Sequence, residues 1–126
     1  MQLVVTEKPS VAQAISHVIG AKERKDGYME GNGFLVSWCV GHLVELAQPE
    51  MYSEVWKKWS YESLPMIPEQ WQHEVKKETA TQYKILKNLM HDTRVESVVC
   101  ATDAGREGEL IFRLVYEQAG CRKPMK

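Results

Sequence analysis

The sequence predicts an α/β fold, a Rossmann-like arrangement in which helices cover both faces of a central, mainly parallel sheet. Two β-favouring runs, residues 2–6 and 96–102, are too continuous for strands with one solvated face and are typical of strands buried on both sides. Apolar residues at helical spacing follow each run, and strands that alternate with helices form parallel sheets. The ligands of such sheets gather at the carboxyl ends of the strands.

The first unit is a strand followed by a helix. Residues 2–6 form the strand, which ends at Glu7. Pro9 suits the first position of a helix, and Gly20 is typical of a helix end. Between them, apolar residues recur at helical spacing: Val11, Ala12, Ile15, Val18 and Ile19.

A hairpin is predicted next. Residues 34–40 are expected to form a second strand, paired with a short strand near Tyr28 across the Gly31-Asn32-Gly33 turn. Gly41-His42 closes this strand. Residues 47–68 contain three prolines and no sustained period, so we expect an ordered excursion without regular secondary structure.

Residues 69–90 are predicted to form one amphipathic helix. Its inward stripe is Val75, Thr79, Gln82, Leu86 and Leu89, and its solvated side holds Lys76, Lys77, Lys84 and Lys87. The last strand, 96–102, leads into a final helix that Gly120 ends. The inward face of that helix is Leu110, Ile111, Leu114, Val115 and Ala119.

Composition restricts the class of protein. The 126 residues suffice for one domain, and a formal net charge of -1 gives no overall attraction to nucleic acid. Binding of DNA would need a local patch, a bound cation or further parts of a longer protein. The three cysteines lack metal-ligand spacing and predict no disulfide framework. No stretch approaches about 18 apolar residues, so we expect no membrane span and a cytoplasmic location.

Four acidic residues follow the two strands of the predicted sheet. Glu7 follows the first strand, and Asp103, Glu107 and Glu109 follow the last. Because several clustered carboxylates do not all stay ionised without a partner, this edge should hold a cation. Oxygen ligands select Mg²⁺, Mn²⁺ or Ca²⁺ over softer metals.

Simpler interpretations remain open for each side chain. Glu7 alone would be a solvated residue before a helix, and Asp103 could cap the last helix. Glu109 points away from Glu107 on a helix, so an ion pair with Arg113 is an alternative to metal binding.

Two further side chains are candidates for phosphate contact. Arg106 is unfavourable for the macrodipole in the first helical turn, which suggests a specific partner, although a surface role remains open. His42 could bind phosphate or hold its loop through a hydrogen bond. The tryptophans Trp56 and Trp59 could stack on DNA bases or pack under the excursion.

Three motifs together resemble a known family. They are Thr6-Glu7-Lys8-Pro9-Ser10, Gly41-His42-Leu43 and the segment 101–109, which reads ATDAGREGE. In this order they resemble the Toprim domain of type IA DNA topoisomerases over essentially the whole chain. The topoisomerase III branch typically also carries a stretch similar to Trp56-Lys57-Lys58-Trp59 followed by residues 64–68, as this chain does.

The resemblance implies a magnesium-assisted transesterification that changes DNA topology. In the family, a tyrosine of a separate domain cleaves one DNA strand and holds its 5′ phosphate until the 3′ hydroxyl rejoins it. Residues 1–126 would then be a Toprim domain, the N-terminal fragment of a longer bacterial topoisomerase without its last β-α unit. Its expected partners are a single-stranded DNA segment and the remaining domains, and the domain alone should be inactive.

The resemblance also assigns roles to residues. Glu7, Asp103 and Glu107 match the metal ligands, and Glu7 matches the proton shuttle for the 3′ oxygen, a role that needs a raised pKa. Lys8 and Arg106 match positions that contact phosphate. Glu109 and His42 are weaker candidates.

One position departs from the family pattern. The family usually has Asp-x-Asp where this chain has Asp103-Ala104-Gly105. We expect weaker Mg²⁺ binding with a water in place of the missing carboxylate. Glycine at 105 could also relax the turn by taking a positive φ.

Two other functions stay open. A Toprim domain of a primase or nuclease would act without a tyrosine partner. A receiver-type signalling module would instead accept a phosphoryl group on Asp103 over bound Mg²⁺.

Overall fold

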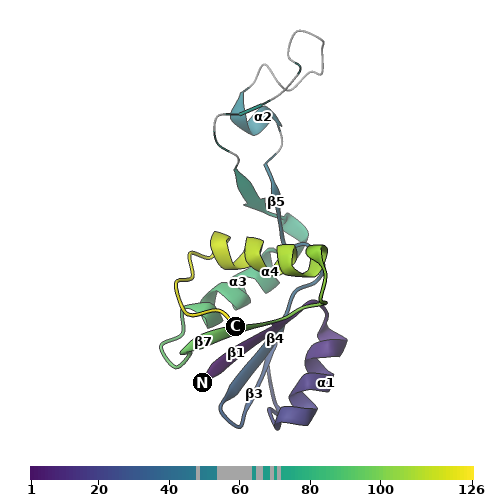
Figure 1. Cartoon of the computed structure of the whole chain (residues 1–126), viewed down its shortest axis with the longest axis vertical. Helices are drawn as coiled ribbons and strands as arrows, with labels where there is room; N and C mark the ends of the chain where they lie inside the picture. Colours follow the sequence, from purple (N-terminus) through teal and green to yellow (C-terminus); the bar gives the residue numbers. More distant parts are fainter. Residues whose placement is uncertain (48, 54–63, 65–66, 69, 71) are drawn as a thin grey trace.

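The computed structural model describes residues 1–47, 49–53, 64, 67–68, 70 and 72–126. The first predicted unit is present as strand β1 (Gln2–Thr6) and helix α1 (Pro9–Ile19) (Figure 1). Pro9 opens the helix, and Gly20 ends it in the left-handed region at φ 83° with its N–H bonded to the Ser16 carbonyl.

The predicted α/β fold is confirmed. A five-stranded sheet has the order β2-β3-β4-β1-β7, and β1 lies between β4 and β7 and runs parallel to both. An antiparallel meander of β2, β3 and β4 completes one side. The strands span Glu23–Lys25 (β2), Tyr28–Gly31 (β3), Phe34–Trp38 (β4) and Ser97–Ala101 (β7).

The predicted hairpin turn is also confirmed. Gly31 pairs with Phe34, which leaves Asn32 and Gly33 as a two-residue turn with φ of 51° and 82°. Positive φ at both positions is the geometry that suits the twist of paired strands, and Asn-Gly accommodates it well. The Asn32 amide donates to the Ile19 carbonyl at 2.8 Å, which ties the turn to the end of α1.

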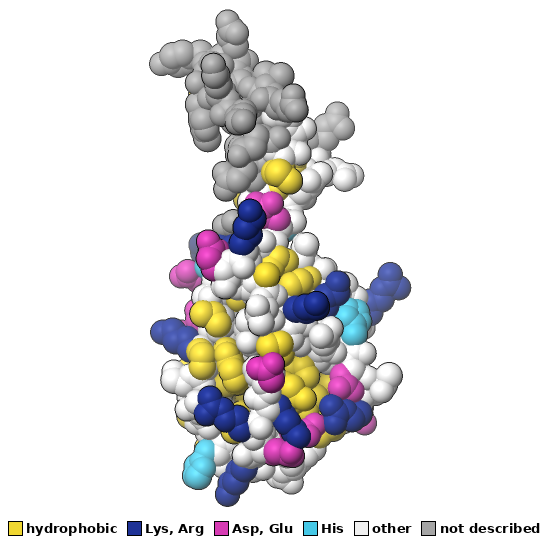
Figure 2. All heavy atoms as spheres, turned by 180° about the vertical axis from the view of Figure 1, so that it is seen from behind, with side chains coloured by type: hydrophobic (Ala, Val, Ile, Leu, Met, Phe, Trp, Pro, Cys, Tyr) yellow, Lys and Arg dark blue, Asp and Glu magenta, His cyan; other side chains and the backbone are white. Residues whose placement is uncertain are grey.

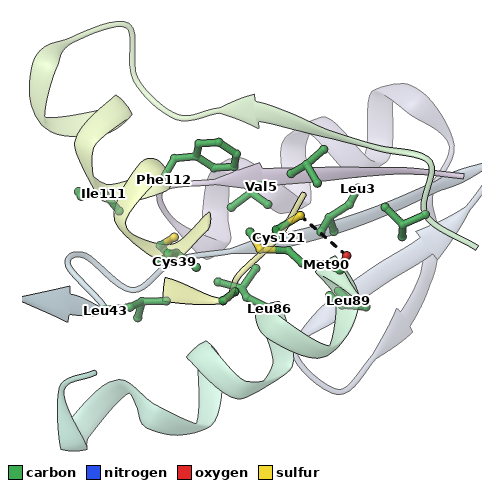
Figure 3. Close-up of a cluster of buried hydrophobic side chains, with 14 of the residues drawn as sticks. Leu3, Val5, Cys39, Leu43, Leu86, Leu89, Met90, Ile111, Phe112 and Cys121 are labelled. Carbon is green, nitrogen blue, oxygen red and sulfur yellow. Dashed lines mark hydrogen bonds between the residues drawn. The ribbon is translucent and has the colours of Figure 1, made fainter. Parts of the chain in front are cut away.

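Helices cover both faces of the sheet. Helix α1 lies on one face, and helices α3 (Ala80–Met90) and α4 (Arg106–Gln118) lie on the other (Figure 1). Side chains alternate accordingly: Leu3 and Val5 of β1 join the larger cluster, whereas Val4 joins Ala12 of α1. Figure 3 shows part of that larger cluster, in which Phe112, Leu86, Met90 and Leu43 are almost completely buried.

The prediction of one helix over residues 69–90 is wrong in its first half. His73–Val75 is a strand, β6, paired antiparallel with β5 (Val44–Leu46), and a 3₁₀ turn, η2 (Lys77–Thr79), precedes α3. The pairing continues beyond the strands, because the Lys76 N–H bonds to the Leu43 carbonyl at 3.0 Å. Val75 therefore belongs to a ribbon and not to a helical stripe.

The predicted excursion contains regular structure. Helix α2 (Pro49–Tyr52) lies within residues 47–68, and Figure 1 shows it beyond β5 at the far end of the ribbon. The family-like stretch with Trp56 and Trp59 lies outside the described residues.

The last residues lie along the outer edge of β7. Met125 bridges Val98 in parallel, and the Lys126 N–H bonds to the Val98 carbonyl at 2.9 Å. On the face shown in Figure 2, Lys and Arg are interspersed with Asp and Glu, as the near-zero net charge predicts. No helix within the described ranges is long and apolar enough to cross a membrane.

Candidate functional site

The parallel register brings the two acidic corners together. Thr6 at the end of β1 pairs with Ala101 at the end of β7, and Glu7 and Asp103 follow these residues directly or by two positions. The Glu7 and Asp103 carboxyl groups lie near enough for a hydrogen bond between them to raise the pKa of Glu7, which requires a proton on one of the two groups. The carboxyl edge of the sheet therefore holds two acids in contact, as the sequence predicts.

The contact with Asp103 changes the pKa of Glu7. Its pKa is raised, first by the hydrogen bond to Asp103, then by desolvation and by the negative charges of Asp103 and Glu107, while Lys8 opposes the shift. The Glu7 Oε2 atom is buried and has no hydrogen-bond partner among the described residues. A buried carboxylate oxygen without a donor fits a hard cation, because oxygen is the ligand that Mg²⁺ prefers.

Gly108 allows helix α4 to pack closely against the Asp103 backbone. A Cβ added to Gly108 in the first turns of α4 would lie 2.4 Å from the Asp103 carbonyl oxygen and 3.1 Å from its backbone nitrogen. No side chain fits there unless the Asp103 loop moves. Sequence reasoning missed this residue, although a glycine inside a helical run costs about 1 kcal/mol relative to alanine and so signals a packing role.

Gly105 does not relax the turn in the way that the sequence suggested. It precedes α4 with φ of -160° and ψ of 168°, extended backbone that any residue adopts, so the expectation of a positive φ is wrong. A Cβ there would meet nothing within 4 Å. An aspartate at position 105 therefore fits without steric cost.

The Glu107 carboxylate lies beside His42. The loop after β4 brings His42 to the same edge, and its Nε2 lies 3.4 Å from the Glu107 Oε1. The Glu107 side chain is 78% exposed and that of His42 is 34% exposed. Among the described residues, no three His, Cys, Asp or Glu side chains are grouped closely enough to hold an ion. The structure thus joins Glu7 to Asp103 and leaves Glu107 beside them, turned to His42.

The predicted cationic residues border the corner. Lys8 is the exposed residue before α1, and Arg106 is the exposed first residue of α4. Arg106, Asp103 and Glu109 line an open hollow of about 590 Å³ beside β7. Glu109 accepts a hydrogen bond from Arg113 Nε at 2.7 Å, which is the ion pair of the simpler interpretation.

A buried thiol that the sequence did not assign to the site lies beside Glu7. The Cys39 N–H continues the sheet by bonding to the Thr6 carbonyl at 2.8 Å, and its side chain is fully buried. Burial, followed by the charge of Glu7 and the proximity of Cys100, raises the pKa of Cys39 to about 12. The thiol stays protonated at neutral pH.

Comparison with known proteins agrees with these features. The family model of the Toprim domain matches residues 2–125. The chain is 46% identical over 123 residues to "DNA topoisomerase 3" of Shouchella clausii. It is 43% and 44% identical over 124 residues to the proteins of that name from Staphylococcus epidermidis and Staphylococcus haemolyticus.

These similarities cover 98% of this chain and 17% of each relative, so the chain spans about one sixth of the length of the curated relatives. The resemblance to a topoisomerase III Toprim domain that the three motifs predicted is confirmed. With its parallel strands, its acidic corner and a match over residues 2–125, the chain belongs to the Toprim domain family.

Proposed function

We propose that this chain forms the cation-binding half of the active site of a type IA DNA topoisomerase of the topoisomerase III kind. The enzyme would cleave and rejoin one DNA strand through a 5′-phosphotyrosine formed by a tyrosine elsewhere in the protein. The contact between Glu7 and Asp103 at the carboxyl edge of the sheet carries the proposal. The similarity to proteins named DNA topoisomerase 3 supports it.

Glu7 and Asp103 would hold Mg²⁺, with Glu107 as a further ligand. Mg²⁺ keeps several waters and often uses only one or two protein carboxylates, so two acids in contact suffice for a weak site. Bound there, the cation would offset the negative charge that develops on the phosphate oxygens. Mn²⁺ and Ca²⁺ are possible substitutes because they also favour oxygen ligands.

Glu7 is the candidate proton carrier. A carboxyl group with a raised pKa holds a proton closer to neutral pH than an ordinary glutamate does and can pass it to or from the 3′ oxygen of DNA. Lys8 and Arg106 lie at the N-terminal ends of α1 and α4, where exposed cations and free backbone N–H groups suit a phosphate.

Three of the described tyrosines are hydrogen-bonded or partly buried within the fold. The Tyr116 hydroxyl donates to the Lys123 carbonyl at 2.6 Å, and burial raises the pKa of Tyr83. The Tyr52 hydroxyl bonds to the Gln72 backbone at 2.6 and 3.0 Å. This supports a nucleophilic tyrosine in another part of the enzyme.

Metal titration tests the proposal. Mn²⁺ binding to the 126-residue chain is measured by electron paramagnetic resonance for the wild type, Asp103→Asn and the control Asp26→Asn. We expect Asp103→Asn to weaken binding by about tenfold or more, as loss of a supporting ligand commonly does, and Asp26→Asn to leave it unchanged. Affinity should increase with pH as Glu7 loses its proton.

Gly105→Asp sharpens the same test. Because position 105 has open space, the added carboxylate should strengthen Mn²⁺ binding severalfold, restoring the usual Asp-x-Asp pattern. Equal affinities for the wild type, Asp103→Asn and Gly105→Asp would contradict the metal site.

Activity separates the alternatives. Cation-dependent cutting of single-stranded DNA by this chain alone would favour the primase or nuclease class over the topoisomerase. Labelling of Asp103 by a phosphoryl donor would favour the receiver class. The topoisomerase assignment expects neither.

A further inference from the structure

Thr6 is a buried polar residue directly before Glu7. It ends β1, it is completely buried, and its backbone lies between Trp38 of β4 and Ala101 of β7. The two preceding positions of the strand are valines, so an apolar side chain of nearly the same shape would suit the pattern of the strand. A buried hydroxyl costs stability unless it has a hydrogen-bond partner. The partner of the Thr6 hydroxyl therefore indicates what the residue does.

The Thr6 hydroxyl is bonded to the residue on the other side of Glu7. Its Oγ1 donates to the Lys8 carbonyl at 2.9 Å. The Ser37 carbonyl lies at 3.5 Å, which is long for a hydrogen bond. A hydroxyl has one proton to donate, so the shorter contact is the bond that the geometry favours. This bond links the residue before Glu7 to the residue after it and closes a ring that contains the Glu7 backbone.

The same carbonyl group starts helix α1. It also accepts a hydrogen bond from the Ala12 N–H at 3.2 Å, as the first turn of a helix requires. Lys8 itself is the N-cap residue, with extended backbone at φ of -136° and ψ of 151°, and its side chain makes no capping bond. The Thr6 hydroxyl therefore ties together the end of the strand, the Glu7 backbone and the start of the helix. Threonine commonly stabilises turns through such side chain to backbone bonds.

Glu7 and Asp103 are held in place by different contacts. The Asp103 backbone packs closely against Gly108. On the Glu7 side, the Cys39 N–H bonds to the Thr6 carbonyl at 2.8 Å, and the hydroxyl of the same threonine fixes the turn. The Glu7 carboxyl group thus extends toward Asp103 from a backbone that is anchored on both sides.

We propose that Thr6 is a positioning residue for Glu7, whose hydroxyl fixes the Glu7 backbone so that the carboxyl group meets Asp103 and shares a cation with it. Groups that orient a metal ligand without touching the metal commonly contribute about 10- to 100-fold to metal affinity. The inference deepens the proposed function and rests on it, since the cation is the ligand whose binding Thr6 supports.

Mn²⁺ binding to variants of Thr6 tests the inference. Electron paramagnetic resonance compares the wild-type 126-residue chain with Thr6→Val and Thr6→Ser. Thr6→Val keeps the shape of the side chain and removes the hydroxyl, so we expect binding to be about tenfold weaker. Thr6→Ser keeps the hydroxyl and should restore nearly wild-type affinity. Thr6→Ala removes the hydroxyl with a smaller side chain and takes the place of Thr6→Val if that variant does not fold.

A second measurement reports the Glu7 turn without metal. Nuclear magnetic resonance gives the three-bond coupling between the amide and α protons of Lys8, which depends on φ. We expect this coupling, large at a φ of -136°, to decrease in Thr6→Val as the turn takes up other conformations, and to persist in Thr6→Ser. The Ala12 amide should also exchange with solvent faster in Thr6→Val, because the carbonyl that accepts its hydrogen bond is held less firmly.

Ser37→Ala is the matched control. Ser37 is also completely buried, and its hydroxyl donates at 2.8 Å to the carbonyl of Gly27, in the turn between β2 and β3. The variant loses a buried hydroxyl from the neighbouring strand, so its stability should fall, but its Mn²⁺ affinity and its Lys8 coupling should not change. Equal weakening of Mn²⁺ binding by Ser37→Ala and Thr6→Val would attribute both effects to general destabilisation and overturn the positioning role.

The outcomes separate this inference from the proposed function. Wild-type Mn²⁺ affinity in Thr6→Val would overturn the positioning role and leave the metal site intact, whether or not the Lys8 coupling changes. Weaker binding with an unchanged coupling would also overturn it, because Thr6 would then not act through the turn. If the wild type binds no Mn²⁺ while the coupling changes as expected, the hold of Thr6 on the Glu7 turn is supported and the proposed metal site is contradicted.

Discussion

The two ends of the central sheet handle charge in opposite ways. At the amino end, Arg94 donates to Asp92 at 2.9 Å and to Glu30 at 2.8 Å, and the N-terminal ammonium donates to the Arg94 carbonyl at 2.8 Å. At the carboxyl end, Glu7 lies against Asp103 with an unpartnered buried oxygen. The first cluster balances its charges within the protein, whereas the second is completed only by a proton or a cation from solution.

The two clusters should respond to pH with opposite signs. Hydrogen bonds from Arg94 lower the pKa of Asp92 below its ordinary 3.8, so its stabilising effect is present above that pH and is lost as pH falls through the lowered value. The pKa of Glu7 is raised above 4.5, so its stabilising effect is present below that pH and is lost as pH rises through the raised value. Neutral pH thus stabilises the charge cluster at the amino end and destabilises the cluster at the carboxyl end.

Gly108→Ala should have the largest effect on the contrast between the charge clusters at the two ends of the sheet. The new Cβ would lie 2.4 Å from the Asp103 carbonyl and displace the corner, at a cost of about 1–3 kcal/mol for overpacking against about 1 kcal/mol gained in helix propensity. We expect net destabilisation in urea unfolding and a loss of Mn²⁺ binding. Gly105→Ala, whose Cβ meets nothing within 4 Å, is the matched control. Equal stability of the two variants would show that the corner tolerates a side chain at 108.

Asp92→Asn should destabilise the charge-balanced cluster around Arg94 at the amino end of the sheet. It keeps the shape of the side chain but removes one charge from the Arg94 cluster. Because Arg94 is 50% exposed, solvent screens the pair, and we expect a small loss of stability near neutral pH that declines below pH 3.8 and vanishes as pH falls through the lowered pKa of Asp92. Unfolding of Asp92→Asn and of the control Asp26→Asn is compared across pH. A deficit in Asp92→Asn that persists in acid would contradict the electrostatic origin.

Glu7→Gln should give the smallest effect and the opposite sign. An amide keeps a donor toward Asp103 but removes the repelling charge, so the variant should melt at a higher temperature than the wild type near neutral pH. Mg²⁺ should stabilise the wild type and not the variant. Glu117→Gln on α4 is the control and should show no such increase. A Glu7→Gln variant that is less stable than the wild type without cation would remove the contrast between the two ends.

The strand-helix units and the acidic corner were predictable because their signals are local. Apolar runs, Pro9, Gly20 and the Asn32-Gly33 turn each act through neighbouring residues, and parallel pairing then brings Glu7 to Asp103. The rest depends on contacts between distant segments.

The β5–β6 ribbon shows why such contacts escape a sequence pattern. His73–Val75 is only three residues long and is a strand because Val44–Leu46 pairs with it. A short two-stranded ribbon is marginal alone, so neither segment carries a strong strand signal. The helical stripe of residues 80–90 extends by chance through Val75, which produced the wrong helix start.

The contacts of Gly108 and Arg94 could not be predicted from the sequence for the same reason. The packing of Gly108 against the Asp103 backbone and the bond from Arg94 to Glu30, 64 positions away, exist only once the sheet has formed. The sequence holds one usable signal, a glycine within a helical run.

The protonated thiol of Cys39 has a consequence for metal choice. Zinc and copper ions favour sulfur in its thiolate form, and an ionised cysteine beside Glu7 would offer these ions a ligand. Burial that raises the pKa of Cys39 to about 12 withholds the thiolate at cellular pH. At the proposed cation site, the burial of Cys39 would therefore leave oxygen ligands alone to bind a metal ion.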